Sequence, residues 1–233
     1  MIIHQLILQH LKHRDDPDFY RLQAEDAVMW LERWGVEFKK RTTVLDLGCG
    51  HGIFGSVLAK RGCQVTFADE SNSLLPELAG SPFRQINIDK DDLGTLGTYD
   101  VVICSNVYEH LSRADLFLQN AAKILKPGGR LFLSWTNWLS IWGGHEFSPF
   151  HYLGSRRGHL IYDQLVKRPR FHTPYENLFP TYIGASIKKI RQIPGLRVLK
   201  IAPRYYPEFA FLMRLPILRE FLAWNCAMVI AKD

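Results

Sequence analysis

Short apolar segments alternate along this chain with segments whose apolar residues recur at helical spacing. Apolar runs bounded by charged or glycine-containing turns predict buried strands. Because these strands alternate with helical segments, they indicate a parallel sheet with helices on both faces. The predicted strands are Val44–Leu47, Gln64–Ala68, Phe83–Ile88, Tyr99–Cys104 and Arg130–Trp135, and two more are expected at Leu196–Lys200 and Ala227–Lys232.

Helix start and stop signals divide the helical segments. An Asp-Pro start, apolar residues at helical spacing and a glycine stop predict an N-terminal helix over residues 15–36. Ser73 and Ser112 are expected to cap two later helices through hydrogen bonds from backbone N–H groups. The later helices are expected at Ile53–Lys60, Ser73–Leu78 and Ala114–Leu125.

The turn after the first strand contains glycines at alternate positions. Asp46 ends the strand, and Gly48, Gly50 and Gly52 follow it. Glycine lacks a Cβ atom and adopts left-handed backbone conformations, so a bulky ligand is expected to rest on the main chain here. The carboxylate of Asp46 is expected to accept hydrogen bonds from a cationic or hydroxyl-bearing ligand.

A dinucleotide-binding turn is the main alternative for this segment. Gly50–Gly55 matches the pattern G-x-G-x-x-G, and Asp69 lies where a ribose-binding acid is expected. An acid at position 46, however, would repel a pyrophosphate. It favours a ligand with a positive centre and no phosphates, such as the sulfonium and α-amino groups of S-adenosylmethionine, over NAD.

Length and composition indicate one globular domain. The chain has 233 residues, and no apolar run reaches the length of a membrane span. Four scattered cysteines without metal-like spacing and the lack of a secretory signal pattern predict a cytoplasmic location. Residues 1–150 hold 15 basic and 18 acidic side chains, whereas residues 151–233 hold 14 and 5. The basic second half favours an anionic substrate, a membrane surface or nucleic acid as a partner, or is a plain solvated surface.

Two segments depart from the alternation of strands and helices. Residues 137–175 are rich in Trp, Gly, His and Pro, and they are too long for a simple connection. An inserted loop over the carboxyl end of a parallel sheet is where a substrate site is expected. Residues 205–222 mix large apolar side chains with Pro and Arg, which fits core packing, a substrate lid or an interfacial element that touches lipid.

Four segments match the motifs of one known family: Val44–Gly52, Tyr99–Cys104, Asn106–His110 and Leu125–Gly129. Through them the chain resembles the class I S-adenosylmethionine-dependent methyltransferases, in the branch that acts on small molecules, lipids or glycans. The resemblance covers roughly residues 40–136, and a weaker match extends to Leu196–Lys200 and Ala227–Lys232. It implies a single α/β domain over residues 1–233, with a Rossmann-like, seven-stranded, doubly wound sheet that is mostly parallel and has an antiparallel C-terminal strand.

The resemblance also assigns residues to the cofactor S-adenosylmethionine. Gly48 and Gly50 would line the methionine moiety, and Asp69 would accept the ribose hydroxyls. Asp89 would hold the adenine, and Ser105 would lie near the amino-acid end. Asp69 and Asp89 could instead have a structural role, because each carboxylate is also placed to cap a following helix or turn. The expected cofactor-binding residues are Asp46, Gly48, Cys49, Gly50, Gly52, Asp69, Glu70, Ile88, Asp89, Ser105 and Asn106.

Several histidines are candidates for catalysis, because an oxygen or nitrogen acceptor loses a proton on methylation. His145 and Glu146 are adjacent in the long loop, where they suit a base and its orienting carboxylate. His151 follows in the same loop, and His110 follows the fourth strand. Each histidine fits a hydrogen-bonded structural role equally well. No metal is expected, because no carboxylate cluster at the strand ends is left after the cofactor residues are assigned.

The acceptor is expected to be a small or amphiphilic molecule, lipid- or glycan-linked, with hydroxyl or carboxyl groups. An anionic acceptor and a peripheral membrane contact both fit the basic second half, and the oligomeric state stays open. Three alternatives remain: an RNA-modifying methyltransferase, a nicotinamide-dependent oxidoreductase and a non-catalytic module that kept the fold. Nucleic acid is the less favoured partner, since the Asn/Asp-Pro-Pro-aromatic motif of amino-methylating nucleic-acid enzymes is missing.

Overall fold

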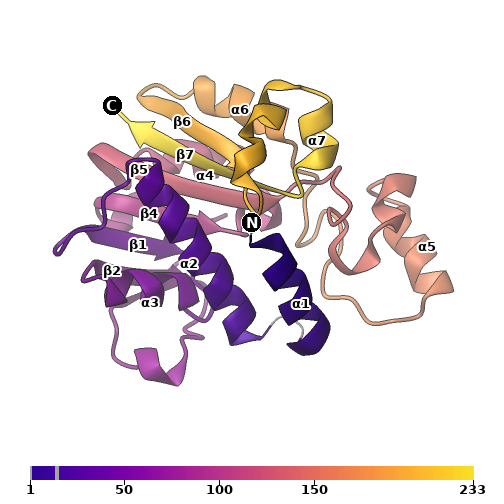
Figure 1. Ribbon diagram of the computed structural model, residues 1–233, viewed down its shortest axis with the longest axis horizontal. Helices are drawn as coiled ribbons and strands as arrows, with labels where there is room; N and C mark the ends of the chain where they lie inside the picture. Colours follow the sequence, from indigo (N-terminus) through magenta and orange to yellow (C-terminus); the bar gives the residue numbers. More distant parts are fainter. Residues whose placement is uncertain (1, 14–15) are drawn as a thin grey trace.

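A seven-stranded sheet forms the centre of the computed structural model, which describes residues 2–13 and 16–233 (Figure 1). The strand order is β3-β2-β1-β4-β5-β7-β6, and only β7 runs antiparallel to its neighbours. The predicted fold class, mostly parallel with an antiparallel C-terminal strand, is confirmed. The strands are β1 (Thr43–Leu47), β2 (Gln64–Asp69), β3 (Phe83–Gln85), β4 (Tyr99–Ser105), β5 (Leu125–Thr136), β6 (Leu196–Pro203) and β7 (Asn225–Lys232).

Helices cover both faces of this sheet, as the sequence predicts (Figure 1). The helices α2 (Pro17–Arg33) and α3 (Ile53–Lys60) contribute to one hydrophobic cluster. The helices α4 (Ala114–Ala121) and α6 (Ile183–Arg191) contribute to a second cluster on the opposite face. The sheet is therefore the middle layer of three.

The central strand β4 shows why its sequence is almost continuously apolar. Val101 and Ile103 point to the α2–α3 side, and Val102 and Cys104 point to the α4–α6 side. Successive side chains of a strand alternate between faces, so a strand covered on both faces is apolar at every position. Polar side chains gather instead at the carboxyl ends of the strands.

Two helices form the N-terminal part of the described chain. A short helix that the sequence pattern did not predict, α1 (Ile3–His13), packs beside α2 (Figure 1). The helix α2 lies within the predicted range 15–36, whose first residue is outside the described part of the chain. Asp16 caps α2 by accepting the N–H of Phe19 at 2.8 Å. No helix in the described residues is both long enough and apolar enough to cross a membrane.

The segment after β2 differs from its prediction. Ser73 caps no helix, and only a single turn, η1 (Pro76–Leu78), follows it. A residue before proline is disfavoured from helical backbone, and Leu75 is extended, with φ −57° and ψ 148°, so no helix runs from Ser73 through Pro76. The strand β3 pairs over only three residues and ends at Gln85, short of the predicted Ile88.

The helix α4 is also shorter than predicted and is capped differently. It ends at Ala121, because Leu125 already pairs with Tyr99 at the start of β5. The Ser112 side chain makes no cap. The carboxylate of Asp89, distant in the sequence, accepts the backbone N–H at the start of this helix instead.

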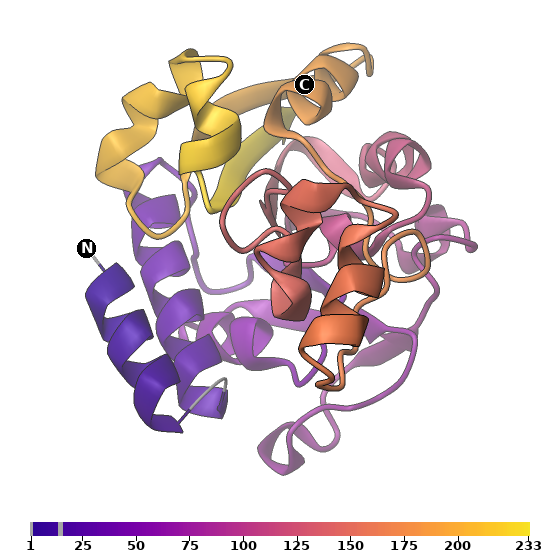
Figure 2. The ribbon, with the colours of Figure 1, turned by 90° about the vertical axis from the view of Figure 1, so that its right-hand side faces the viewer.

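Residues 137–175, which we call the insertion, fold into a compact layer beyond the carboxyl ends of the parallel strands (Figures 1 and 2). The insertion has its own buried cluster, which gives it a fixed shape. The members of that cluster within the insertion are Trp138, Phe147 and Tyr162, and Leu178 joins them from the segment that follows. The insertion contains the turns η4 (His145–Phe147) and η5 (Phe150–Leu153) and the helix α5 (Gly158–Leu165).

Residues 205–222 pack beside the end of β6 as the turn η6 (Pro207–Arg214) and the helix α7 (Leu218–Leu222) (Figure 1). Met213 anchors the segment in the core. The carboxylate of Glu220 accepts the N–H groups of the first two residues of α6, at 2.9 and 2.7 Å, and so caps that helix. Two further turns are η2 (Leu93–Leu96) and η3 (Tyr108–His110).

Candidate functional site

The glycine turn after β1 closes through hydrogen bonds to the end of β2. The N–H groups of Gly48 and Cys49 donate to the carbonyl oxygen of Ala68 at 2.8 and 3.2 Å. The N–H of Gly50 donates to the Asp69 carboxylate at 2.8 Å. Two predicted cofactor residues, Gly50 and Asp69, are thus in direct contact.

The three glycines of this turn are required for different reasons, although all three have a positive φ. A Cβ atom on Gly48 would lie 2.4 Å from a methyl group of Val107, and one on Gly52 would lie 2.6 Å from a methyl group of Leu74. A Cβ atom on Gly50 would meet nothing within 4 Å. The single explanation offered for all three glycines is therefore corrected: only Gly50 borders open space, and the other two make room for the protein's own side chains.

Asp46 lies inside the turn, not on its surface. Only 3% of the residue is exposed, and its carboxylate accepts the N–H of Gly55 at 2.7 Å. Burial raises the pKa of Asp46 to about 7. The hydrogen bond from Gly55 lowers this pKa, and the charge of Asp69 raises it further, but both effects are smaller than that of burial. The residue anchors the start of α3, and near neutral pH its protonation is sensitive to an added positive charge. Burial likewise raises the pKa of the Cys49 thiol to about 12, so this cysteine is not a nucleophile.

Asp69 and Glu70 form an acidic pair beside the turn. The second oxygen of Asp69 accepts the N–H of Glu70 at 2.7 Å. A carboxylate oxygen of Glu70 accepts the side-chain amide of Asn87 at 2.5 Å. Each carboxylate oxygen has more than one lone pair, so the pair keeps the capacity to accept hydrogen bonds from ligand hydroxyls.

Asp89 adopts the capping role that the sequence left as the plain alternative. Its two carboxylate oxygens accept the N–H groups of Ser112 and Arg113 at 2.9 and 3.1 Å. Ile88 beside it is buried, with 7% exposure. The contacts of Asp89 thus explain the residue structurally, and its predicted contact with adenine depends on lone pairs that the cap leaves free.

A buried arginine reaches the ends of β4 and β5 from the residue that follows β6. The Nη1 atom of Arg204 donates to the hydroxyls of Ser105 and Ser134, both at 3.0 Å, and to the side-chain oxygen of Asn106 at 3.2 Å. Asn106 also accepts from the amide of Asn225 at 2.9 Å. The predicted residues Ser105 and Asn106 therefore belong to a polar cluster at the carboxyl edge of the sheet.

Arg204 is a cation without an ion-pair partner among the described residues. It is 2% exposed, burial lowers its pKa, and its Nε atom has no hydrogen-bond partner. A buried charge is costly unless it is paired or fully hydrogen-bonded. The arrangement is suited to an anionic group of a ligand. Nothing in the sequence around Arg204 distinguishes it from the other arginines, so no local pattern predicts this role.

Three histidines from separate segments meet near the end of β4, and we call them the histidine cluster. His110 ends η3, His145 begins η4 in the insertion, and His172 follows α5. The ring centroids are separated by 4.4 Å (His145 and His172), 5.0 Å (His110 and His172) and 5.4 Å (His110 and His145). The sequence predicted catalytic roles for His110 and His145 but missed His172, which lies far from both along the chain.

The rings of the histidine cluster have different partners. The Nδ1 atom of His172 donates to the Glu146 carboxylate at 2.8 Å, and Nδ1 of His110 donates to the carbonyl oxygen of Asn177 at 2.7 Å. The Nδ1 atom of His145 is buried without a partner. Burial, followed by the charges of His172 and His110, lowers the pKa of His145 to about 3. His145 is therefore neutral at physiological pH and is a weak base on its own.

Glu146 acts within this cluster as the partner of His172. Burial raises the pKa of Glu146, but the hydrogen bond and charge of His172 outweigh that effect, so the pKa lies below its usual value. The neighbouring carboxylate Glu109 is buried, and one of its oxygens accepts the N–H of Thr136 at 2.8 Å. Glu109 thus ties η3, and with it His110, to the end of β5.

His151 lies apart from the cluster, with both ring nitrogens engaged. Its Nε2 atom donates to the carbonyl oxygen of Ser140 at 3.0 Å, and its Nδ1 atom lies 3.4 Å from the hydroxyl of Ser148. The side chain is 1% exposed and packs 4.0 Å from the ring of Tyr152. Burial lowers the pKa of His151. These contacts are those of a structural residue within the insertion, and none of them supports the predicted catalytic role.

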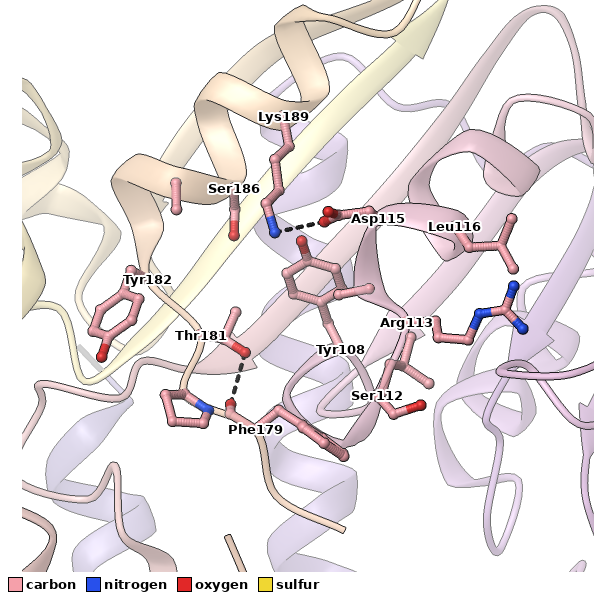
Figure 3. Close-up of a pocket in the computed structure, with 14 residues that line it drawn as sticks. Tyr108, Ser112, Arg113, Asp115, Leu116, Phe179, Thr181, Tyr182, Ser186 and Lys189 are labelled. Atoms are coloured by element: carbon pink, nitrogen blue, oxygen red, sulfur yellow. Dashed lines mark hydrogen bonds and ion pairs between the residues drawn. The ribbon is translucent and has the colours of Figure 1, made fainter. Parts of the chain in front are cut away.

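A pocket of about 430 Å³ lies on the α4–α6 side, next to η3 (Figure 3). Tyr108 lies at its centre, and the ammonium group of Lys189 meets the carboxylate of Asp115 at 2.5 Å (Figure 3). Neither the glycine turn nor the histidine cluster lines this pocket. It is separate from the cofactor residues described above.

The whole sequence can now be compared with known proteins. The family model described as a methyltransferase domain matches residues 19–200. An uncharacterized methyltransferase of Mycobacterium bovis is 31% identical over 94% of this chain and 89% of its own length. The chain belongs to the methyltransferase family. A further uncharacterized methyltransferase, from Mycobacteroides abscessus, is 28% identical over 91% of this chain and 86% of its own length.

Solved methyltransferase structures share the fold. An S-adenosylmethionine-dependent methyltransferase from Mesorhizobium loti has a TM-score of 0.60 at 16% identity, covering 89% of this chain and 98% of that one. The magnesium protoporphyrin IX methyltransferase of Synechocystis, with bound SAH, has a TM-score of 0.56 at 17% identity, covering 92% and 84%. At these identities the likeness concerns the fold. Together with the family match it confirms the predicted class I methyltransferase and does not favour the oxidoreductase or the non-catalytic alternative.

The described residues fit S-adenosylmethionine, the methyl donor of this family. Gly50 borders open space, the Asp69–Glu70 pair keeps free lone pairs, and Asp46 suits a nearby positive charge. The cofactor prediction is thus confirmed at the level of the family. Which residue binds which part of the cofactor stays a prediction.

Proposed function

We propose that this methyltransferase transfers the methyl group of S-adenosylmethionine to an oxygen or nitrogen of a small or amphiphilic acceptor that carries an anionic group. One observation carries the proposal: the histidine cluster and Arg204 both lie where the parallel strands end, on the side that the insertion covers. Imidazoles suit an acceptor that must lose a proton, and a buried guanidinium suits an anion.

The glycine turn supports the cofactor half of the proposal. Gly50, Asp69 and Glu70 would hold the methionine and ribose parts, while Ile88 offers an apolar surface to the adenine. The cofactor supplies the activated methyl carbon, so the protein mainly aligns the acceptor and excludes water. Ser105 and Asn106 connect the two halves, since both accept hydrogen bonds from Arg204.

The acceptor half relies on alignment and on help with the leaving proton. Because His145 is a weak base by itself, we assign the activation of the acceptor to the histidine cluster as a unit, with Glu146 holding His172 in place. Arg204 would pair with a carboxylate or phosphate of the acceptor. The fixed core of the insertion keeps these groups in position.

The segment of residues 205–222 supports an amphiphilic acceptor. Its buried anchor is Met213, but most of its large apolar side chains face solvent. Single exposed apolar residues are ordinary, whereas a group of them on one short segment marks an interaction surface. The basic second half would add attraction to an anionic lipid surface. The exposed apolar residues are Phe209, Phe211, Leu215, Ile217, Leu218, Phe221 and Leu222.

A methyl-transfer assay with labelled S-adenosylmethionine tests the proposal. The full chain is incubated with fractionated lipid, polysaccharide, RNA and metabolite extracts, and the variant Gly50→Val serves as the cofactor-binding control. We expect label in a lipid, glycan or small-metabolite fraction with the wild type and none with the variant. Label that enters only RNA would overturn the acceptor class, and the basic second half would then be the RNA contact.

A further inference from the structure

The histidine cluster has the composition of a transition-metal site. Among the described residues, His110, His145 and His172 each offer a ring nitrogen within 4.8 Å of the other two. Imidazole is the preferred ligand of zinc and of other late divalent metals, whereas magnesium and calcium prefer oxygen. The three rings come from three separate segments, so their meeting is a feature of the tertiary fold.

The outer hydrogen bonds of the cluster match those of metal-binding histidines. A carbonyl or carboxylate oxygen only accepts, so His110 and His172 must each carry their proton on Nδ1. A neutral ring with its proton on Nδ1 has its lone pair on Nε2, and that nitrogen is the one able to bind a metal. A ligating histidine that donates its other N–H to a carboxylate or a backbone carbonyl is the usual arrangement around protein-bound zinc.

The third ring adds an independent observation. Nδ1 of His145 is buried and has no hydrogen-bond partner in the protein. His145 also has a φ of 49°, which is uncommon for a residue with a side chain. A buried polar atom without a partner is costly, and a strained backbone persists only where the surrounding structure holds it. A metal ion shared with the other two rings would account for both costs.

We propose that His110, His145 and His172 bind a zinc-type divalent ion, with Glu146 and the Asn177 carbonyl as the outer partners that orient the rings. Three protein ligands leave a coordination position open, which is the pattern of catalytic rather than structural zinc sites. The expectation of no metal weighed His145, Glu146 and His151 as ligand-type residues and rejected a metal because no carboxylate cluster is left at the strand ends. It could not include His172 or the approach of the three rings.

The open position gives the ion a role that rests on the proposed function. An acceptor hydroxyl bound there loses its proton to solvent water more easily, because the cation lowers the pKa of a bound O–H. The acceptor oxygen then forms the bond to the methyl carbon as the carbon–sulfur bond breaks, and the bonding electron pair stays on sulfur. The weak basicity of His145 is no obstacle in such a step.

Metal binding can be measured without the methyl-transfer reaction. The full chain is treated with a chelator, dialysed and titrated with Zn²⁺ alone by calorimetry, and with Co²⁺ by visible absorption. We expect one equivalent of metal per chain and the ligand-field bands of Co²⁺ bound by nitrogen ligands. His145→Asn and His172→Asn should lose this binding, and Glu146→Gln should weaken it by roughly 10–100-fold.

Controls separate the site from general damage and from the proposed function. His159→Gln changes another histidine of the insertion that is outside the cluster, so its metal binding should equal that of the wild type. Circular dichroism checks that each variant folds, and Zn²⁺ should raise the melting temperature of the wild type but not of the His145 variant. No binding by the wild type, or equal binding by the cluster variants, would overturn the metal site. Zinc binding without methylation of any acceptor would leave the site intact and overturn the proposed function instead.

Discussion

The two halves of the carboxyl edge are built in opposite ways. The glycine turn joins residues that are close in sequence, with Gly48, Cys49 and Gly50 bonded to Ala68 and Asp69. The histidine cluster joins η3 to two separate parts of the insertion, η4 and the residues after α5, and Arg204 follows the end of β6. The part that we assign to the cofactor is thus one local motif, whereas the part that we assign to the acceptor is assembled by tertiary contacts.

The two halves also differ in charge. The cofactor half has several carboxylates, of which Asp46 is buried and has a raised pKa. The acceptor half has a cation, Arg204, without an ion-pair partner among the described residues, and a neutral His145. This difference suits a positively charged methyl donor on one side and an anionic acceptor on the other.

The largest effect is expected from closing the cofactor half. Gly50→Val places a branched side chain in the open space beside the turn, so binding of S-adenosylmethionine should be lost and turnover with it. Gly195→Val is the matched control, because Gly195 also has a positive φ and open surroundings but precedes β6 at the opposite edge. Calorimetry with the cofactor checks both variants. Normal binding by Gly50→Val would remove the turn from the cofactor site.

Substitutions in the acceptor half should change kcat and leave the affinity for the cofactor unchanged. His145→Ala should lower kcat by roughly 10²–10⁴-fold, the usual contribution of a group that assists proton loss. His151→Ala is the paired control: we expect a lower melting temperature from its lost buried contacts, with kcat little changed in the folded fraction. Steady-state kinetics and thermal unfolding test the pair. If both variants kept wild-type turnover, acceptor methylation would depend on alignment alone.

Asp46 should make the cofactor half sensitive to pH. Its folded pKa of about 7 lies above the unfolded value of about 4. The folded state therefore holds the proton more tightly, and the stability contributed by this residue is lost as the pH rises from about 4 to about 7. Asp46→Asn, which keeps an acceptor for Gly55, should remove up to about 4 kcal/mol of that change in unfolding free energy.

Denaturant unfolding of the wild type and of Asp46→Asn at several pH values isolates this term, since all other titrating groups are shared. The difference in unfolding free energy between the two proteins should change between pH 4 and 7 and stay level above pH 7. A difference that is independent of pH would show that Asp46 titrates normally.

Substitutions of Arg204 should affect turnover and stability differently. Arg204→Met keeps the volume but removes a buried charge, so the melting temperature should stay equal or rise. The value of kcat/KM for an anionic acceptor should fall by roughly 10–100-fold, as for a lost hydrogen bond to a charged group. Arg204→Lys should not restore it, because an ammonium lacks the planar donor fork. A lower melting temperature with unchanged kcat/KM would make Arg204 structural.

The smallest effect concerns the exposed apolar residues near α7. Ile217→Ser with Phe221→Ser should weaken binding to anionic lipid vesicles by roughly threefold to tenfold, since two partly exposed side chains contribute little each. Leu165→Ser, at the equally exposed end of α5, is the control and should change nothing. Vesicle co-sedimentation measures the difference. Equal binding by all three proteins would leave residues 205–222 without a lipid contact.

The cofactor half was readable from the sequence because its information is local. Hydrophobic periodicity located the first five strands, the resemblance to the family implied the last two, and the Asp46–Gly52 string is the most specific of the family's motifs. Even there, the prediction that all three glycines make room for a ligand was wrong. Gly48 and Gly52 instead make room for the side chains of Val107 and Leu74, and no local sequence pattern predicts these contacts.

Capping shows the same limit. A serine before a helix predicts a cap, yet Asp89 supplies the cap of α4 from β3's end of the sheet, and Glu220 caps α6 from α7. A backbone N–H group donates to whichever oxygen the fold brings near, so a capping partner can be close or distant in the sequence.

The sequence by itself determined the fold class, the family and the glycine turn, because strand periodicity and a tight turn depend on neighbouring residues. Only the tertiary structure decided which residues meet at the part of the edge that we assign to the acceptor. It buried Arg204 beside Ser105, separated His151 from the histidine cluster and brought His172 to His110 and His145. These contacts join residues far apart along the chain, and such distances become short only when the insertion packs over the carboxyl edge.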